Sequence, residues 1–124
     1  MEETKTNPVK GKTVYLSGPM TGMPDLNREA FERAEARCYE LGARFVLNPR
    51  EFWGHTDRAP EWYMRRDLHL LTNPGGGDGE GVAFDALLAL PGYRMSRGAM
   101  AEVMCAELSG IEVLRYSDLL GVRA

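Results

Sequence analysis

Residues 84–114 read FDALLALPGYRMSRGAMAEVMCAELSGIEVL and decide the fold class of this chain. The run from Phe84 to Leu90 is apolar on both faces, which is typical of a central strand in a parallel sheet. A helix is predicted next, with Ser96 as its N-cap and Gly110 near its end. A short strand at 111–114 follows, so this stretch predicts two parallel strands joined by a helix.

The rest of the chain repeats this alternation. Two more apolar strands are predicted at 13–17 and 43–47, two more helices at 27–41 and 60–71, and a terminal helical turn at 117–120. The order β-α-β-α-β-α-β predicts an α/β fold of the Rossmann or flavodoxin-like type. We expect a three-layer sandwich in which helices flank a parallel sheet of four to five strands. Ligands bind in such folds at the edge where the strands' carboxyl ends meet.

Composition predicts a single domain over residues 13–124. The chain has 124 residues, of which 44% are hydrophobic and 27% charged, and these are ordinary values for a globular domain. Polar residues dominate at 1–12 and predict a flexible N-terminal tail. The glycine-rich run 73–81 predicts a loop, and the absence of a following Lys-Ser/Thr pair argues against a phosphate-binding P-loop.

Charge and cysteine content narrow the function classes. A net charge of −3, with no basic cluster beyond Arg65-Arg66, disfavours a nucleic-acid polymer as partner. Neither a signal peptide nor an apolar run near ~18 residues is present, so we expect a cytoplasmic protein with no membrane partner. Cys38 and Cys105 lie among apolar residues and are typical of buried free thiols. No Cys or His pair has metal-ligand spacing, and we predict neither a metal nor a cofactor.

Glu102 stands out in the predicted helix because the residues three and four positions away are all small. They are Gly98, Ala99, Cys105 and Ala106, and none can pair with a carboxylate as Lys or Arg would. This pattern leaves space beside the Glu102 carboxylate for a ligand. The alternative is an ordinary solvated glutamate on a helix surface.

Asp67 is the second unusual carboxylate. It lies on the apolar stripe of the helix at 60–71, among Tyr63, Met64, Leu70 and Leu71. Burial raises the pKa of a carboxyl group, and a raised pKa suits a general acid near neutral pH. The alternative interpretation is that Asp67 pairs with an arginine or caps a loop.

Several segments are predicted to meet at the ligand-binding edge of the sheet. They are the strand end and loop from Tyr15 to Met20, Asn48 and the loop from Pro91 to Gly98. The loop 50–59 lies at the same edge, and its Trp53 suits either stacking on a planar ligand or filling the core. Asp85 begins its strand at the opposite edge, which favours a structural role.

Five short motifs have a familiar spacing: YLSGP at 15–19, NP at 48–49, DL at 67–68, LPGY at 90–93 and SRGAMAE at 96–102. Over residues 13–120 the chain resembles a small family of uncharacterised bacterial and phage proteins related to nucleoside 2-deoxyribosyltransferases and nucleotide N-hydrolases. The resemblance implies that Glu102 attacks C1′ of the sugar as the base departs. It also implies that Tyr15 orients Glu102 and that Asp67 handles the proton of the leaving base.

The substrate is expected to contact the edge loops, through Ser17, Gly18, Pro19, Met20, Asn48, Ser96, Arg97 and Gly98. Many of the transferases carry an acidic residue at the position of Ser96, whereas related nucleotide N-hydrolases have a serine there that meets a 5′-phosphate. The amino end of a helix suits an anion as well. Ser96 therefore favours a nucleotide over a nucleoside, although a plain N-cap explains a serine too.

The expected function is cleavage of the N-glycosidic bond of a nucleoside 5′-monophosphate or nucleoside through a glutamyl-sugar intermediate. The enzyme is a hydrolase if water takes the sugar and a deoxyribosyltransferase if another base does. The alternatives are a non-catalytic binding protein for a nucleotide or nucleotide-derived signal, and a structural protein without a ligand. The resemblance also implies a homo-oligomer, for which Met100, Met104 and Leu108 form either an apolar seam or part of the core.

Overall fold

Four short strands form a parallel sheet in the computed structural model, which describes residues 6–49, 59–74 and 83–124. In chain order they are β1 (Thr13–Ser17), β2 (Phe45–Leu47), β3 (Ala86–Ala89) and β4 (Glu112–Arg115). They lie in the order β2-β1-β3-β4, and every neighbouring pair is parallel. The strand order reverses between β1 and β3, and folds of this class bind ligands at such a reversal. The predicted α/β fold is confirmed.

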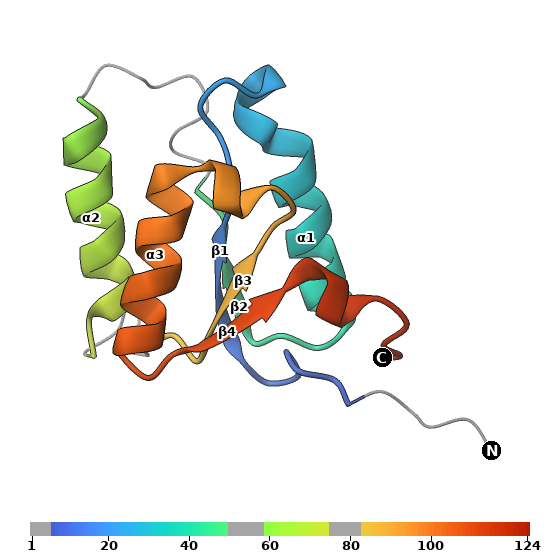
Figure 1. Cartoon of the computed structure of the whole chain (residues 1–124). Helices are drawn as coiled ribbons and strands as arrows, with labels where there is room; N and C mark the ends of the chain where they lie inside the picture. The colour runs from blue at the N-terminus through green and yellow to red at the C-terminus, as the bar shows by residue number, and fades with distance from the viewer. Residues whose placement is uncertain (1–5, 50–58, 75–82) are drawn as a thin grey trace.

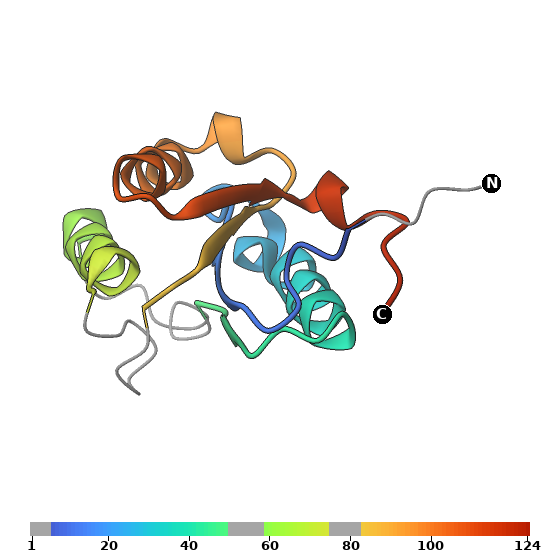
Figure 2. The same cartoon turned by 90° about the horizontal axis from the view of Figure 1, so that it is seen from below.

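Three helices cover the two faces of the sheet (Figure 1). One face carries α1 (Arg28–Glu40), and the other carries α2 (Pro60–Thr72) and α3 (Arg97–Leu108). Figure 2 shows the three layers from below, with the sheet between α1 and the α2–α3 pair. Three short 3-10 helices complete the described elements: η1 (Pro24–Asn27), η3 (Tyr93–Met95) and η4 (Tyr116–Leu119).

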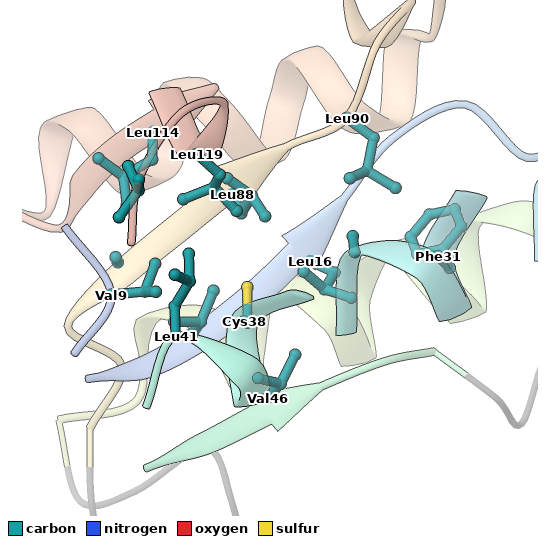
Figure 3. Packing of buried hydrophobic residues seen from close by; sticks show 14 residues of the cluster. Val9, Leu16, Phe31, Cys38, Leu41, Val46, Leu88, Leu90, Leu114 and Leu119 are labelled. Atoms are coloured by element: carbon teal, nitrogen blue, oxygen red, sulfur yellow. The ribbon is translucent and has the colours of Figure 1, made fainter. Parts of the chain in front are cut away.

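The alternation of side chains along β1 separates two apolar clusters. Leu16 points to the α1 face, where it joins a cluster with Phe31, Cys38 and Leu88 (Figure 3). Tyr15 points to the opposite face and joins a smaller cluster under α2 and α3. Odd-numbered residues of β1 therefore face α3, which is what places Tyr15 and Ser17 on the side of Glu102.

Two strands are shorter than the sequence predicts. The strand expected at 43–47 is reduced to β2 because the Ala43 amide donates to the Cys38 carbonyl at the end of α1, at 3.0 Å. The strand expected at 84–90 is reduced to β3. Its flanks still follow β1, since the Asp85 amide donates to the Thr13 carbonyl at 2.9 Å and the Leu90 amide to the Ser17 carbonyl at 2.8 Å.

The segment before β1 corrects the prediction of a flexible tail over residues 1–12. Val9 is fully buried in the α1-side cluster, beside Leu41 (Figure 3). The Asn7 side chain donates to the Leu41 carbonyl at 2.7 Å, and the Gly11 amide donates to the Gly42 carbonyl at 2.9 Å. The burial of Val9 and these two hydrogen bonds fix the segment against the end of α1. The prediction of a flexible tail is therefore wrong for residues 7–12. Residues 1–5 lie outside the described ranges.

The two cysteines differ in burial. Cys38 is buried, and its burial raises the pKa of the thiol to about 12. Cys105 is only half-buried, so the prediction of two buried thiols holds for one of them. Within the described ranges, none of the helices combines the length and hydrophobicity that crossing a membrane requires.

Candidate active site

The packing of α3 turns Glu102 toward the sheet. Ser96 caps the helix, since its hydroxyl oxygen accepts from the Ala99 amide at 3.1 Å. Small buried residues, Ala99 and Ala106, let α3 sit close to the strands. Glu102 lies between them on the same face and is only 7% exposed, so it is not a solvated surface glutamate.

Two hydroxyl groups of β1 hold the Glu102 carboxylate. The Tyr15 hydroxyl donates to Oε2, and the Ser17 hydroxyl donates to Oε1 at 2.7 Å. Both donors come from one strand because residues two apart in a strand share a face. The resemblance implies the Tyr15 contact. The sequence does not predict the Ser17 contact, because its position at the end of the strand predicts a contact with the substrate instead.

Burial dominates the electrostatics of Glu102 and raises the pKa of its carboxyl group to about 7. The hydrogen bonds from Tyr15 and Ser17 oppose this shift because they stabilise the ionised form. The nearby charge of Asp67 raises the pKa a little further. Burial and the charge of Glu102 raise the pKa of Tyr15 well above its ordinary value, so Tyr15 stays a hydrogen-bond donor at neutral pH.

Asp67 projects from α2 into the same region. Its side chain is 13% exposed, and burial raises the pKa of its carboxyl group to about 6. Arg66 opposes the shift, with Nη2 at 3.5 Å from Oδ1 of Asp67. Asp67 is therefore largely buried, as its place on the apolar stripe predicts, and it has the arginine neighbour of the alternative interpretation. Its role as a general acid stays a prediction. Its charge acts on both Tyr15 and Glu102, so the two carboxyl groups share one electrostatic environment.

The loop after β1 packs tightly against the loop after β3. A Cβ atom on Gly18 would lie 2.8 Å from Cβ of Leu90, so only glycine fits this approach. Pro19 is buried, and Met20 is half-buried against the α1-side cluster. These contacts explain Gly18, Pro19 and Met20 by packing, and their predicted contact with a substrate stays a prediction.

Asn48 is placed away from Glu102. Its Nδ2 donates to Oε1 of Glu35 on α1 at 3.0 Å, so the side chain contacts the opposite helix layer. It is 4% exposed, and its Oδ1 atom has no hydrogen-bond partner in the part of the chain that the structure describes. The structure thus does not bring Asn48 together with Tyr15, Ser17 and Glu102.

The amino end of α3 carries the three residues predicted to meet a phosphate. The Ser96 hydroxyl accepts from within the helix, and its hydrogen can still donate to an anion. Arg97 is exposed, whereas Gly98 packs against α2, where an added Cβ would lie 3.0 Å from Cε of Met64. The helix cap is therefore shown, and the phosphate contact stays a prediction.

The remaining predictions fall elsewhere. Asp85 has the structural role expected of it, since its Oδ2 accepts from the Thr13 amide at 2.8 Å at the opposite edge of the sheet. Trp53 in the predicted loop 50–59, and most of the glycine-rich run 73–81, lie outside the described residues. In ranges 6–49, 59–74 and 83–124, no three His, Cys, Asp or Glu side chains gather as a metal site would require.

Two surface hollows lie away from these carboxylates. One, of about 310 Å³, lies over the outer side of α3 and is lined by Tyr93, Arg94, Met100, Val103, Met104, Glu107 and Arg115. The other, of about 60 Å³, lies beside the loop after β3 and is lined by Ala30, Arg33, Leu90, Pro91 and Tyr116. Among the described residues, neither hollow is lined by Glu102 or Asp67.

Comparison with known proteins places the chain in a family. A family model described as "Domain of unknown function (DUF4406)" matches residues 12–115, so the chain belongs to this family. The match covers every strand and all three long helices. Searches among curated proteins and among solved structures find no match.

Proposed function

We propose that this member of the DUF4406 family cleaves the N-glycosidic bond of a nucleoside 5′-monophosphate or nucleoside. The supporting observation is the buried Glu102 carboxylate, which two neutral hydroxyl donors hold without neutralising its charge. In its ionised form, this carboxylate is suited to attack an electron-poor sugar carbon. A second carboxyl group, Asp67, lies in the same environment with a pKa of about 6.

In the first step, an oxygen of Glu102 forms a bond to C1′ of the sugar, and the bond from C1′ to the base nitrogen breaks. The electron pair of that bond leaves with the base, which takes the proton of Asp67. Retaining glycosidases divide their work between two carboxyl groups in the same way. The pKa of Glu102, about 7, lies above that of Asp67, about 6, so the form with ionised Glu102 and protonated Asp67 is a minor one. Its population is highest between about pH 6 and 7, where turnover is expected to peak.

In the second step, the Asp67 carboxylate accepts a proton from water as the water oxygen bonds to C1′. The ester bond between C1′ and Glu102 breaks, and the carboxylate is restored. If the nitrogen of a second base attacks in place of water, the outcome is deoxyribosyl transfer. The same residues serve both outcomes, so product analysis decides between hydrolase and transferase.

Base release tests the proposal. Wild-type protein is incubated with a panel of ribo- and deoxyribonucleosides and their 5′-monophosphates, and free bases are measured by chromatography. Glu102→Gln should lose activity by about a thousandfold or more, because the nucleophile is gone. Glu107→Gln is the matched control: it makes the same change on the exposed side of the same helix and should leave the rate unchanged.

Mass spectrometry of the acid-quenched reaction adds a direct test, since the intermediate adds one sugar to a peptide containing Glu102. Absence of base release from every compound, with the protein folded, would overturn the proposal for these substrates. Nucleotide binding without turnover would then support the alternative of a binding protein. If no compound of the panel bound, the result would support the alternative of a structural protein.

A further inference from the structure

Ser17 is almost completely buried. It is 1% exposed at the carboxyl end of β1, and its backbone is in register with Ala89 of β3. Its hydroxyl is committed to Oε1 of Glu102 at 2.7 Å. A hydroxyl that is buried and already donating to a carboxylate is poorly suited to bind sugar or phosphate. Glu102, which accepts this hydrogen bond, is the nucleophile of the proposed reaction.

We propose that Ser17 is a positioning residue that, together with Tyr15, favours the ionised form of Glu102 and fixes the plane of its carboxylate. The proposal rests on the proposed function, in which Glu102 is the nucleophile. It changes the role of Ser17 from a contact for the substrate to a support for the reacting group. Two observations carry it: the placement of the donors and their neutrality.

The placement of the donors fixes the geometry of the carboxylate. Tyr15 and Ser17 lie two residues apart on one face of β1, and each donates to a different oxygen of Glu102. A carboxylate held at both oxygens cannot rotate about its last bond, whereas one held at a single oxygen can. Both donors lie on β1, an inner strand of the sheet, where Tyr15 is in register with β2 and β3 and Ser17 with β3. Supporting contacts of this kind keep a reacting group in its productive orientation.

The neutrality of the donors matters for reactivity. None of the ion pairs seen in the described residues involves Glu102; they join Arg28 to Glu32, Arg33 to Glu29, Arg37 to Glu40 and Arg66 to Asp67. A cation would keep Glu102 ionised but would withdraw the charge that attack requires. Two hydroxyl groups stabilise the ionised form against its burial and leave that charge in place. Loss of Ser17 removes one of the two hydrogen bonds that oppose the effect of burial.

The experiment measures the titration of Glu102 directly and through turnover. The carboxyl carbon of Glu102 is followed by 13C NMR in labelled protein, with Glu102→Gln assigning the signal. Ser17→Ala should move the titration midpoint upward by about one pH unit or more, the shift expected when an ionised carboxylate loses one hydrogen bond. Tyr15→Phe should move it in the same direction.

Turnover is measured with 4-nitrophenyl 2-deoxyriboside, whose leaving group needs no proton from Asp67. The pH profile of kcat/KM then reports the ionisation of Glu102 alone, and Ser17→Ala should move it upward by the same amount. Ser17→Cys tests for a packing effect: it nearly keeps the size of the side chain but donates weakly, so it should resemble Ser17→Ala. Ser17→Thr keeps the hydroxyl and should resemble the wild type.

An unchanged midpoint in Ser17→Ala would overturn the proposal. A higher KM with an unshifted pH profile would also overturn it, because that result identifies a substrate contact. A Ser17→Cys protein that titrates like the wild type would identify a packing role and reject the proposal as well. The NMR midpoint does not depend on turnover, so a wild-type protein that releases no base would refute the proposed function while the titration still decides the role of Ser17.

Discussion

At the scale of single residues, two carboxyl groups are held in surroundings that disfavour their charged forms. The pKa of Glu102 is raised from its ordinary 4.5 to about 7, and that of Asp67 from 3.8 to about 6, in both cases chiefly by burial. Each group therefore binds its proton more tightly in the folded chain than in the unfolded one. The tighter proton binding by these two groups stabilises the folded chain fully below pH ~4. This stabilisation is lost as the pH rises through the folded-state pKa values of Asp67, about 6, and Glu102, about 7.

We therefore expect the free energy of unfolding to fall between pH 5 and pH 8. Urea unfolding across this range measures it, and Glu102→Gln should flatten the decline because a glutamine has no proton to lose. Glu107→Gln, on the exposed side of α3, should keep the wild-type slope. If Glu102→Gln showed the same slope as the wild type, the raised pKa of Glu102 would be refuted.

The sequence predicts these two carboxylates and, through the resemblance, the contact of Tyr15 with Glu102, but not the contact of Ser17. Positions three and four apart in a helix are neighbours, so the small residues around Glu102 and the apolar ones around Asp67 can be found from spacing alone. Ser17 is 85 positions away from Glu102. Its contact depends on how α3 is seated on β1, which no local pattern encodes. The strand period did contain a signal, since Ser17 had to share a face with Tyr15.

At the scale of elements, the amino end of α3 combines a structural task with a proposed one. Ser96 caps the helix through the Ala99 amide, and the same end is predicted to meet a 5′-phosphate. Ser96→Ala should lower the free energy of unfolding by about 1 kcal/mol, the usual cost of a lost N-cap. Ser96→Asp should keep the cap, since aspartate accepts the same hydrogen bond.

The two variants separate capping from phosphate binding. The negative charge of Ser96→Asp repels a phosphate, so kcat/KM should fall for 5′-monophosphates and stay unchanged for nucleosides. Base release from matched nucleoside and nucleotide pairs measures this ratio, and thermal unfolding verifies the cap. An equal effect of Ser96→Asp on both substrate classes would show that α3 does not bind the phosphate.

Element type is predictable here and element length is less so. Apolar periodicity identifies all four strands and the three long helices. The ends of β2 and β3 differ from the predicted strand ends. Backbone hydrogen bonds at the end of α1 and in the loops there compete with the hydrogen bonds between strands. The composition of residues 1–12 predicts a flexible tail because polar residues outnumber Val9, which the structure buries. The average composition of a segment does not reveal that one apolar residue in it packs into the core.

At the scale of the whole molecule, the outer side of α3 is apolar and uncovered. Met100, Met104 and Leu108 are 37%, 58% and 83% exposed, so they are not part of the core, which was one of the two options that the sequence left open. They follow one another at four-residue intervals and form a ridge beside the hollow of about 310 Å³. A surface of this kind marks an interaction site.

We propose that a second copy of the chain covers this ridge. The hollow beside it carries charges of both signs, from Arg94 and Arg115 and from Glu107, so the surface is complementary to itself. A two-fold axis brings the same patch of two copies face to face, which sets each acidic group near the basic groups of the other copy. Methionines of one ridge then enter the hollow of its partner.

Light scattering coupled to size-exclusion chromatography measures the outcome. The wild type is expected at twice the chain mass, and Met104→Glu at the monomer mass, because a charge at the centre of the ridge would be buried without a partner. Leu120→Glu is the control: this leucine is 59% exposed after η4, outside the ridge and its hollow. Glu107→Arg should also give monomers, and Arg94→Glu added to it should restore dimers if the charges pair across the axis. A wild-type protein that is monomeric at all concentrations would exclude a second copy as the partner of α3.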